Sequence, residues 1–373
     1  MKKIVKIILI NVAIFCVAII ALLAVYEVYL RLKINNPGTI KTVIEKPIYR
    51  TDPDLGWAHQ PNITFDYAGS KSFFNEFGQR SNHLTPGSPA PRILLLGDSF
   101  TFGMNVKQDE TISAFMQKNL DSKKYEISGG SDVMNAGVVG YSIRQELIHL
   151  TREFDTLKPD TVILNIFVGN DLTEQRRSEV ERDKNGFPVG IKDKEVLVTP
   201  DGYLGSHDAI PFHSLAIADL AQRKKQFLMK LQKYPGYIWP VFMDEKNPLL
   251  PPDMASLWTQ YEADLARMKS FLDSKKVQFL VVIIPMDVQV SRNYWQKYPD
   301  QIFGEKEFEL KVPQQKLKEI CNRNKINCLD LLPIFQKNTD QQLYFPQIDP
   351  HFAIPGNQLT AESILNKILN PKS

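Results

Sequence analysis

From residue 92 to the C-terminus, short apolar runs alternate with amphipathic stretches. The apolar runs lie at 92–96, 132–137, 160–168, 277–285 and 327–332. Runs of this length that are apolar on both faces predict strands buried inside a parallel sheet. The stretches between them have apolar residues three or four apart, which predicts helices near 110–120 and at 142–157, 254–274, 313–324 and 357–369. The alternation predicts an α/β fold whose parallel sheet is covered by helices on both faces.

The N-terminus follows a different pattern. A cluster of three lysines precedes a run from Ile7 to Val25 that contains no charged residue. As a helix rising about 1.5 Å per residue, this run nearly matches the hydrocarbon core of a bilayer, which is about 30 Å thick. We therefore predict a transmembrane anchor with its flank at residues 1–33. A cleaved signal peptide is the alternative, but its apolar region is usually shorter, and no A-x-A cleavage site follows the run.

The charges beside the apolar run predict its orientation. Slightly more positive groups precede the run than follow it: the terminal amine, Lys2, Lys3 and Lys6 against Arg31, Lys33 and Lys41. The positive-inside rule then favours a cytoplasmic N-terminus and a large domain outside the cytoplasm, in the periplasm or at the cell surface. Outside the anchor the only cysteines are Cys321 and Cys328, which form either a disulfide or two core thiols.

Composition divides the rest of the chain. Residues 34–90 are rich in Pro, Asn, Gly and aromatic residues, so we expect an extended segment with short strands. Residues 91–373 form the main predicted domain, and its alternation is interrupted at about 173–250. We interpret this interruption as an insertion beside the carboxyl edge of the sheet; a surface loop with one helix is the alternative. The net charge of +3 and the lack of a dense Lys/Arg run argue against a nucleic-acid partner.

Candidate chemistry lies where the predicted strands end. Ser99 directly follows the first strand, and a serine becomes a nucleophile when a base takes its proton. Its backbone N–H, that of Gly140 and the side-chain amide of Asn170 are candidate donors to an oxyanion. His351 is the candidate base, and Asp349, two residues earlier, is the candidate acid that orients it. Each residue alone has a commoner structural explanation, such as a turn or a helix cap, but together they supply a complete set.

Four stretches resemble the sequence blocks of the SGNH family of GDSL-type hydrolases. They are GDSF at 97–100, NAGVVGYS at 135–142, GND at 169–171 and DPH at 349–351. The roles that the resemblance implies are a triad of Ser99, His351 and Asp349 and an oxyanion hole of Ser99, Gly140 and Asn170. Gly137 is the weaker match in the second block. The family's last block usually reads D-x-x-H, whereas here the acid stands two residues before the histidine, as in a subset of the family.

The resemblance covers roughly residues 92–173 and 277–369. It implies a flavodoxin-like three-layer α/β/α fold with about five parallel strands. The predicted anchor and the FNEFGQRSN stretch resemble the membrane-anchored bacterial members of the family.

The resemblance implies a serine esterase that needs no cofactor and no metal. The expected substrate is an O-acetyl or short-chain ester, on an envelope carbohydrate or a lipid. If a sugar hydroxyl replaces water, the same residues make an O-acyltransferase on an envelope polysaccharide. A non-catalytic envelope module is the third hypothesis, and the intact residue set argues against it, because binding alone does not require all of these groups.

Overall fold

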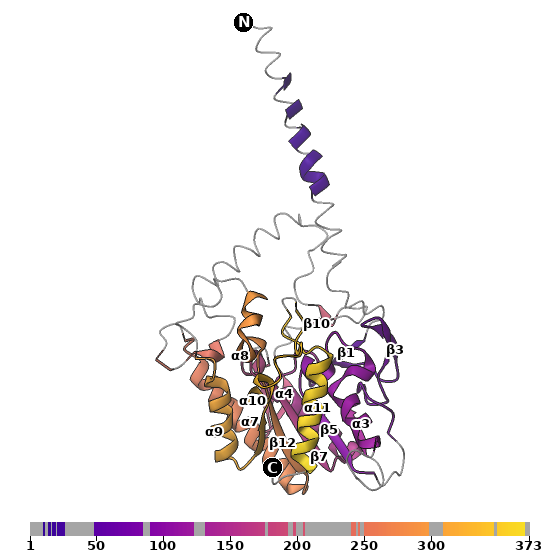
Figure 1. Ribbon diagram of the computed structural model, residues 1–373, viewed down its shortest axis with the longest axis vertical. Coiled ribbons are helices and arrows are strands. Elements are labelled where there is room, and N and C mark those ends of the chain that lie inside the picture. Colours follow the sequence, from indigo (N-terminus) through magenta and orange to yellow (C-terminus); the bar gives the residue numbers. More distant parts are fainter. Residues whose placement is uncertain are drawn as a thin grey trace. The chain divides into compact units, whose positions relative to one another are not determined.

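A computed structural model describes most of the chain (Figure 1). The described residues are 48–84, 90–122, 131–175, 178–192, 197–198, 204–205, 240–243, 245–246, 250–297, 309–346, 349–369 and parts of 10–26. Residues 44–207 and 234–373 form one compact unit, and residues 1–43 and 208–233 are grouped in a second. All features below belong to the first unit unless stated otherwise.

In the described part of the chain, five parallel strands form the central sheet, in the order β13-β12-β7-β5-β6. They are β5 (Arg92–Leu96), β6 (Asp132–Asn135), β7 (Thr161–Phe167), β12 (Gln278–Ile284) and β13 (Asn327–Asp330). Counted along the chain, this order is 2-1-3-4-5, which is the flavodoxin-like order. Every residue of β7 is buried, as expected for a strand covered on both faces. The predicted parallel sheet is confirmed.

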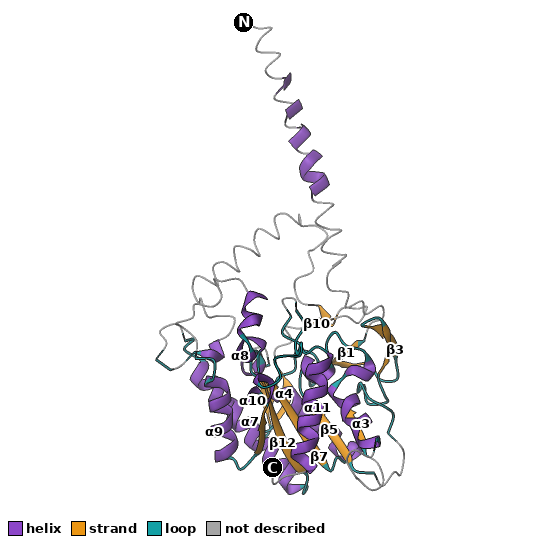
Figure 2. Cartoon of the chain, viewed as in Figure 1, coloured by secondary structure: helices purple, strands orange, loops and turns teal. Residues whose placement is uncertain are grey.

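Helices cover both faces of the sheet (Figure 2). The longest are α3 (Ile112–Asp121), α4 (Ile143–Leu157), α7 (Met254–Ser274), α9 (Val312–Arg323) and α11 (Ile354–Leu369). Helix α3 contacts α11, and α4 contacts α7. Right-handed crossovers explain this division, because they place α3 on one face and α4, α7 and α9 on the other. Helix α11 follows the last strand and lies beside α3. The short helices are α2 (Ser99–Phe102), α5 (Asp171–Glu174), α8 (Asp287–Val290) and α10 (Leu332–Gln336).

Two hairpins precede the sheet in the chain. Strands β1 (Tyr49–Asp52) and β2 (Gly56–His59) form the first, and β3 (Thr64–Tyr67) and β4 (Ser70–Phe73) form the second. We call residues 48–83 the hairpin segment. Its apolar side chains join Phe102, Val138, Tyr141 and Ile148 in a second buried cluster beside the main core. The predicted short strands are therefore present, and they are packed onto the turns that follow β5 and β6.

Only part of the predicted insertion at 173–250 is described. It contains the hairpins β8 (Val180–Arg182) with β9 (Pro188–Ile191) and β10 (Leu197–Val198) with β11 (Leu204–Gly205), and a 3₁₀ turn, η3 (Pro240–Phe242). The helix suggested for its basic stretch lies outside the described residues. Further 3₁₀ turns are η1 (Gln108–Glu110) and η4 (Arg292–Lys297).

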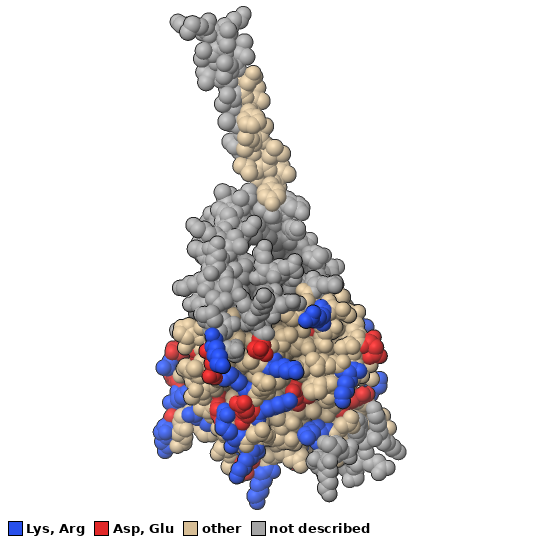
Figure 3. All heavy atoms as spheres, turned by 60° about the vertical axis from the view of Figure 1, so that its left-hand side comes forward, with Lys and Arg blue, Asp and Glu red and all other residues tan. Residues whose placement is uncertain are grey.

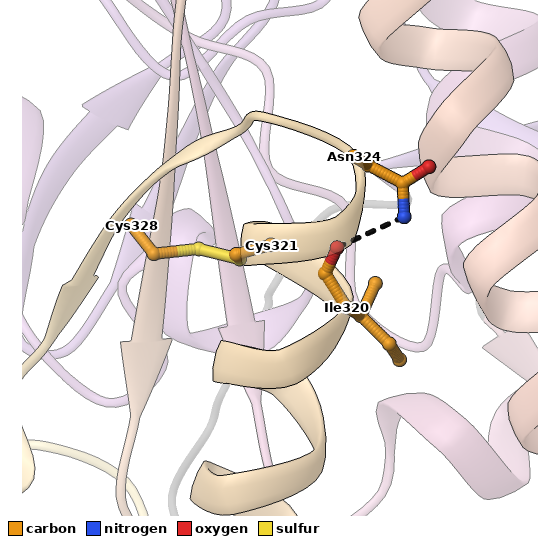
Figure 4. Close-up of a disulfide and its surroundings, with 4 residues drawn as sticks. All are labelled: Ile320, Cys321, Asn324 and Cys328. Atoms are coloured by element: carbon orange, nitrogen blue, oxygen red, sulfur yellow. Dashed lines mark hydrogen bonds between the residues drawn. A yellow bond between two sulfur atoms is a disulfide. The ribbon is translucent and has the colours of Figure 1, made fainter.

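A disulfide ties α9 to the edge strand β13. Cys321 and Cys328 are bonded, which answers the choice between a disulfide and two thiols (Figure 4). In the turn between them, the Asn324 amide donates to the Ile320 carbonyl at 2.9 Å. The surface on this side mixes both signs of charge (Figure 3), and Arg323 of α9 pairs with Glu262 of α7 at 2.7 Å.

The predicted anchor at residues 1–33 is described only in part. Its described residues, which lie between 10 and 26, are helical and exposed. Among all the residues that the structure describes, no helix combines the length and the apolar character that a membrane crossing requires.

Candidate active site

Ser99 lies at a sharp turn between β5 and α2. Gly97 has φ +147°, and a Cβ added there would lie 2.2 Å from Thr101 Oγ1, so this position favours glycine. Asp98 caps the helix, because its Oδ1 accepts from the backbone N–H of Phe100 at 2.9 Å. The turn therefore places Ser99 at the first helical position, at the carboxyl edge of the sheet.

Three of the predicted site residues form one hydrogen-bonded chain. His351 Nε2 is 2.7 Å from Ser99 Oγ, and His351 Nδ1 is 2.6 Å from Asp349 Oδ1. The same Asp349 oxygen accepts from the backbone N–H of His351 at 2.9 Å. An acid two residues before the histidine therefore reaches the distal ring nitrogen. The order hydroxyl, imidazole, carboxylate is that of a serine-hydrolase triad.

The pKa values of Asp98, next to Ser99, and of Asp349 are shifted in opposite directions. Burial raises the pKa of Asp98, and the N–H of Phe100 and the His351 ring offset this only in part. Burial also acts to raise the pKa of Asp349, but hydrogen bonds from His351, its charge and the Asn105 amide together hold that pKa below the ordinary value. Of these two groups, Asp349 is thus the one that ionises more readily, as expected for an acid that orients a histidine.

The strand order places the candidate oxyanion donors on both sides of Ser99. Strand β5 lies between β6, which leads to Gly140, and β7, which leads to Asn170. Within the described residues, the backbone N–H groups of Ser99 and Gly140 have no acceptor. The Asn170 amide nitrogen lies 3.5 Å from carboxylate oxygens of both Asp98 and Glu174, at the limit of hydrogen-bond range. The two backbone donors are therefore available to a bound anion, and the Asn170 amide would exchange two long contacts for one to the anion.

The structure distinguishes the two glycines of the second stretch. The Gly137 N–H donates to Asn135 Oδ1 at 3.1 Å, and a Cβ added at Gly137 would lie 2.3 Å from the Phe102 nitrogen. Gly137 therefore serves close packing. Gly140 has φ +76°, its N–H is free among the described residues, and an added Cβ would meet only Trp57, at 3.6 Å. Of the two glycines, only Gly140 has an N–H available for a ligand.

Two further buried carboxyl groups interact with Asp98. Burial raises the pKa values of Glu146 on α4 and Asp171 on α5, and the charge of Asp98 raises them further. Asp171 also accepts from the backbone N–H of Phe167 at 2.8 Å. Nevertheless, no cluster of three or more His, Cys, Asp or Glu side chains among the described residues is arranged to hold a metal ion.

One contact of the triad lacks any signal in the sequence. The Asn105 amide donates to Asp349 Oδ2 at 2.6 Å across a separation of 244 residues. Asn105 follows GM in a turn and belongs to none of the four stretches, so only the fold reveals this contact.

The comparisons with known proteins give structural likeness only. No family model and no curated protein matches the chain. Among solved structures, a lipase/acylhydrolase from Enterococcus faecalis is 14% identical, with a TM-score of 0.39, over 75% of this chain and 96% of that one. The acetyl xylan esterase AlAXEase is 13% identical, with a TM-score of 0.40, over 74% and 99%. The Axe2 acetylxylan esterase from Geobacillus stearothermophilus is 13% identical, with a TM-score of 0.38, over 76% and 96%.

Likeness of this degree does not transfer an activity. The site rests instead on its own geometry, in which Ser99, His351 and Asp349 are in contact while Gly140 and Asn170 follow the strands on either side. In its four stretches, its strand order and the contacts of this triad, the chain resembles the SGNH family of GDSL-type hydrolases.

Proposed function

We propose that the protein is a serine esterase that works through an acyl-enzyme. The observation that carries this proposal is the chain from Ser99 Oγ to His351 Nε2 at 2.7 Å and from His351 Nδ1 to Asp349 Oδ1 at 2.6 Å. A hydroxyl in such a chain can lose its proton to the imidazole as it attacks, and the carboxylate stabilises the imidazolium that forms.

The acylation step follows from these contacts. Ser99 Oγ attacks the ester carbonyl, and its proton passes to His351 Nε2. The negative charge that develops on the carbonyl oxygen accepts hydrogen bonds from the N–H groups of Ser99 and Gly140 and from the Asn170 amide. When the intermediate collapses, the bond to the alcohol breaks, and His351 returns the proton to the leaving oxygen.

Deacylation repeats the sequence with water. His351 takes a proton from water, the hydroxide adds to the acyl carbonyl, and collapse releases the acid while the proton returns to Ser99 Oγ. A sugar hydroxyl in place of this water would make the enzyme an O-acyltransferase. The two reactions share every protein group, so only the acceptor distinguishes them.

We propose further that the substrate is an O-acetyl or short-chain ester on an envelope carbohydrate or lipid and that the domain lies outside the cytoplasm. Two observations support this location. The described residues between 10 and 26 expose large apolar side chains such as Phe15 and Leu22, which suits membrane attachment. The Cys321–Cys328 disulfide suits an oxidising compartment.

The test uses the full chain in detergent, with p-nitrophenyl acetate as substrate and Ser99→Ala as control. We expect turnover in the wild type that disappears in the variant. Labelling of Ser99 by a fluorophosphonate provides a second reading, because it requires an activated serine but no particular substrate. Labelling without hydrolysis, followed by acyl transfer to an added glycan, would favour the transferase. A wild type that neither hydrolyses nor labels would contradict a serine-hydrolase site and favour a binding module.

A further inference from the structure

The carboxylate of Asp349 has two oxygens, and different parts of the chain hold them. Oδ1 accepts from Nδ1 and the backbone N–H of His351, within the same loop. Oδ2 accepts from the Asn105 amide at 2.6 Å. We propose that Asn105 is a positioning residue of the triad, which fixes the carboxylate plane of Asp349 and keeps this group ionised. The inference rests on the function proposed above, because it assigns a role within that same site.

The short spacing of Asp349 and His351 makes this second contact important. The backbone around His351 is anchored, since Phe345 N donates to the His351 carbonyl at 3.1 Å and Tyr344 forms a β-bridge with Phe352. These bonds hold the imidazole side of the pair. The Asn105 bond adds a restraint at the other carboxylate oxygen, from a part of the chain far from His351.

Asn105 is itself held in an uncommon backbone conformation. Its φ is +63°, in the left-handed region that asparagine tolerates better than most residues. Its backbone N–H donates to the Tyr67 hydroxyl at 2.9 Å, and that hydroxyl donates to Met104 Sδ at 2.9 Å. Tyr67 belongs to β3, so the hairpin segment determines where Asn105 lies.

Arg80, near the end of the hairpin segment, binds the loop of residues 102–106 that contains Asn105. Its guanidinium donates to the carbonyls of Phe102 at 3.1 Å, Gly103 at 2.7 Å and Val106 at 2.8 Å. Arg80 is only 1% exposed, and its guanidinium lies over the Tyr67 ring at 4.7 Å. Three carbonyls of one loop on one buried cation make residues 102–106 a rigid platform for Asn105.

The chemistry of the amide suits this role. The Asn105 N–H donates to Asp349 and so stabilises its ionised form. The amide nitrogen is not a base, so it cannot take the proton that His351 carries on Nδ1. Aspartate at position 105 would have nearly the same shape but would place a second carboxyl oxygen against Asp349 Oδ2. Glycine would keep the left-handed backbone and remove the donor. These two substitutions therefore separate the hydrogen bond from the fold of the turn.

The experiment compares Asn105→Gly and Asn105→Asp with the wild type, as full chains. The matched controls are Asn62→Gly and Asn62→Asp, because Asn62 also has a left-handed φ of +57° but is exposed. We expect kcat for p-nitrophenyl acetate to fall about 10- to 100-fold in Asn105→Gly with KM nearly unchanged. For Asn105→Asp we expect a loss that grows with pH, because below neutrality the two carboxyl groups can share one proton. The Asn62 variants should retain wild-type kinetics.

A second measurement separates this inference from the proposed function. In ¹³C-labelled protein, with the carboxyl signal assigned through Asp349→Asn, we expect a higher pKa for Asp349 in Asn105→Gly than in the wild type. This reading needs no substrate, so it stands even if the wild type neither hydrolyses esters nor labels with a fluorophosphonate. An unchanged Asp349 titration would overturn the inference, as would kinetics within twofold of the wild type across the pH range. A kcat loss that merely follows a lowered melting temperature, with a wild-type pH profile, would also overturn it.

Discussion

The proposed nucleophile and the proposed base of the candidate site lie in regions of different construction. Ser99 follows β5, an interior strand of the sheet, and begins the short helix α2, which is capped by the adjacent residue Asp98. His351 lies in a loop, its side chain is 18% exposed, and its partner Asp349 takes a hydrogen bond from residue 105. The nucleophile side is thus held locally, and the base side is held by residues far away in the sequence.

The difference indicates where the site is most easily disturbed. Ser99 lies just beyond a strand that is paired on both sides, so we expect its position to change only when the sheet is disturbed. Asp349 takes a hydrogen bond from residue 105, so we expect a change in the 102–106 loop to reach its carboxylate. We therefore expect distant substitutions to alter the base side while the nucleophile side stays in place.

Removing the proposed nucleophile or the proposed base should have the largest effect. We expect Ser99→Ala and His351→Ala each to lower kcat/KM for an aryl acetate by about 10⁴- to 10⁶-fold, because these groups act as one unit. For the same reason, the double variant should be no slower than the slower single variant. If the loss in the double variant equalled the product of the two single losses, Ser99 and His351 would act independently. That result would contradict a catalytic triad.

Removing Asn170, the proposed oxyanion donor that follows β7, should have the next largest effect on kcat. Asn170→Ala removes one donor, and we expect a fall in kcat of about 10²- to 10³-fold with KM little changed, since the bond forms only with the charged intermediate. The exposed Asn185 offers a control, where the same substitution should leave kcat unchanged. A loss at Asn170 below about fivefold would exclude it from the oxyanion hole.

Much of the fold could be predicted from the sequence, because the apolar pattern is strong where the sheet is buried. The β7 stretch TVILNIF is mostly apolar and fully buried, and helix α7 occupies the predicted residues 254–274. Four short stretches also led to the residues that meet at the carboxyl edge of the sheet. Their catalytic roles stay predictions, but the contact of Ser99 with His351 and of His351 with Asp349 is present in the structure.

What could not be predicted depends on tertiary contacts. No pattern in the sequence connects Asn105 to Asp349, because a single asparagine in a turn has many structural uses. Likewise, the sequence favoured Gly140 over Gly137 by resemblance alone, and only the fold gives the physical reason, which is that the Gly137 N–H is already bonded. The burial of Arg80 was equally invisible, because an isolated arginine is usually a surface residue.

Arg80→Met tests whether the base side depends on the hairpin segment. The substitution leaves three loop carbonyls without their donor, so we expect a loss of unfolding free energy of about 3 kcal/mol, measured by urea denaturation. We also expect kcat to fall at temperatures where the variant is still folded, because the loop that carries Asn105 loses its platform. Arg50→Met, at an exposed arginine, is the control. Full activity in a folded Arg80→Met variant would show that the base side needs no such support.

The smallest effect on the site itself is expected from His59 of the hairpin segment, which should alter only the pH dependence of stability. Burial lowers the pKa of His59 to about 3, and its ring stacks on Phe74 with 4.1 Å between centroids. In the unfolded chain a histidine titrates near 6.5, so between about pH 6.5 and 3 the unfolded state binds more protons and stability falls as the pH falls. His59→Phe removes this one proton and should flatten the slope by up to about 1.4 kcal/mol per pH unit in that window. Urea unfolding at several pH values measures the slope, with exposed His83→Phe as control. An equal slope in wild type and His59→Phe would mean that protonation of other groups causes the loss of stability in acid. The hairpin segment would then be no more acid-sensitive than the sheet that carries Ser99.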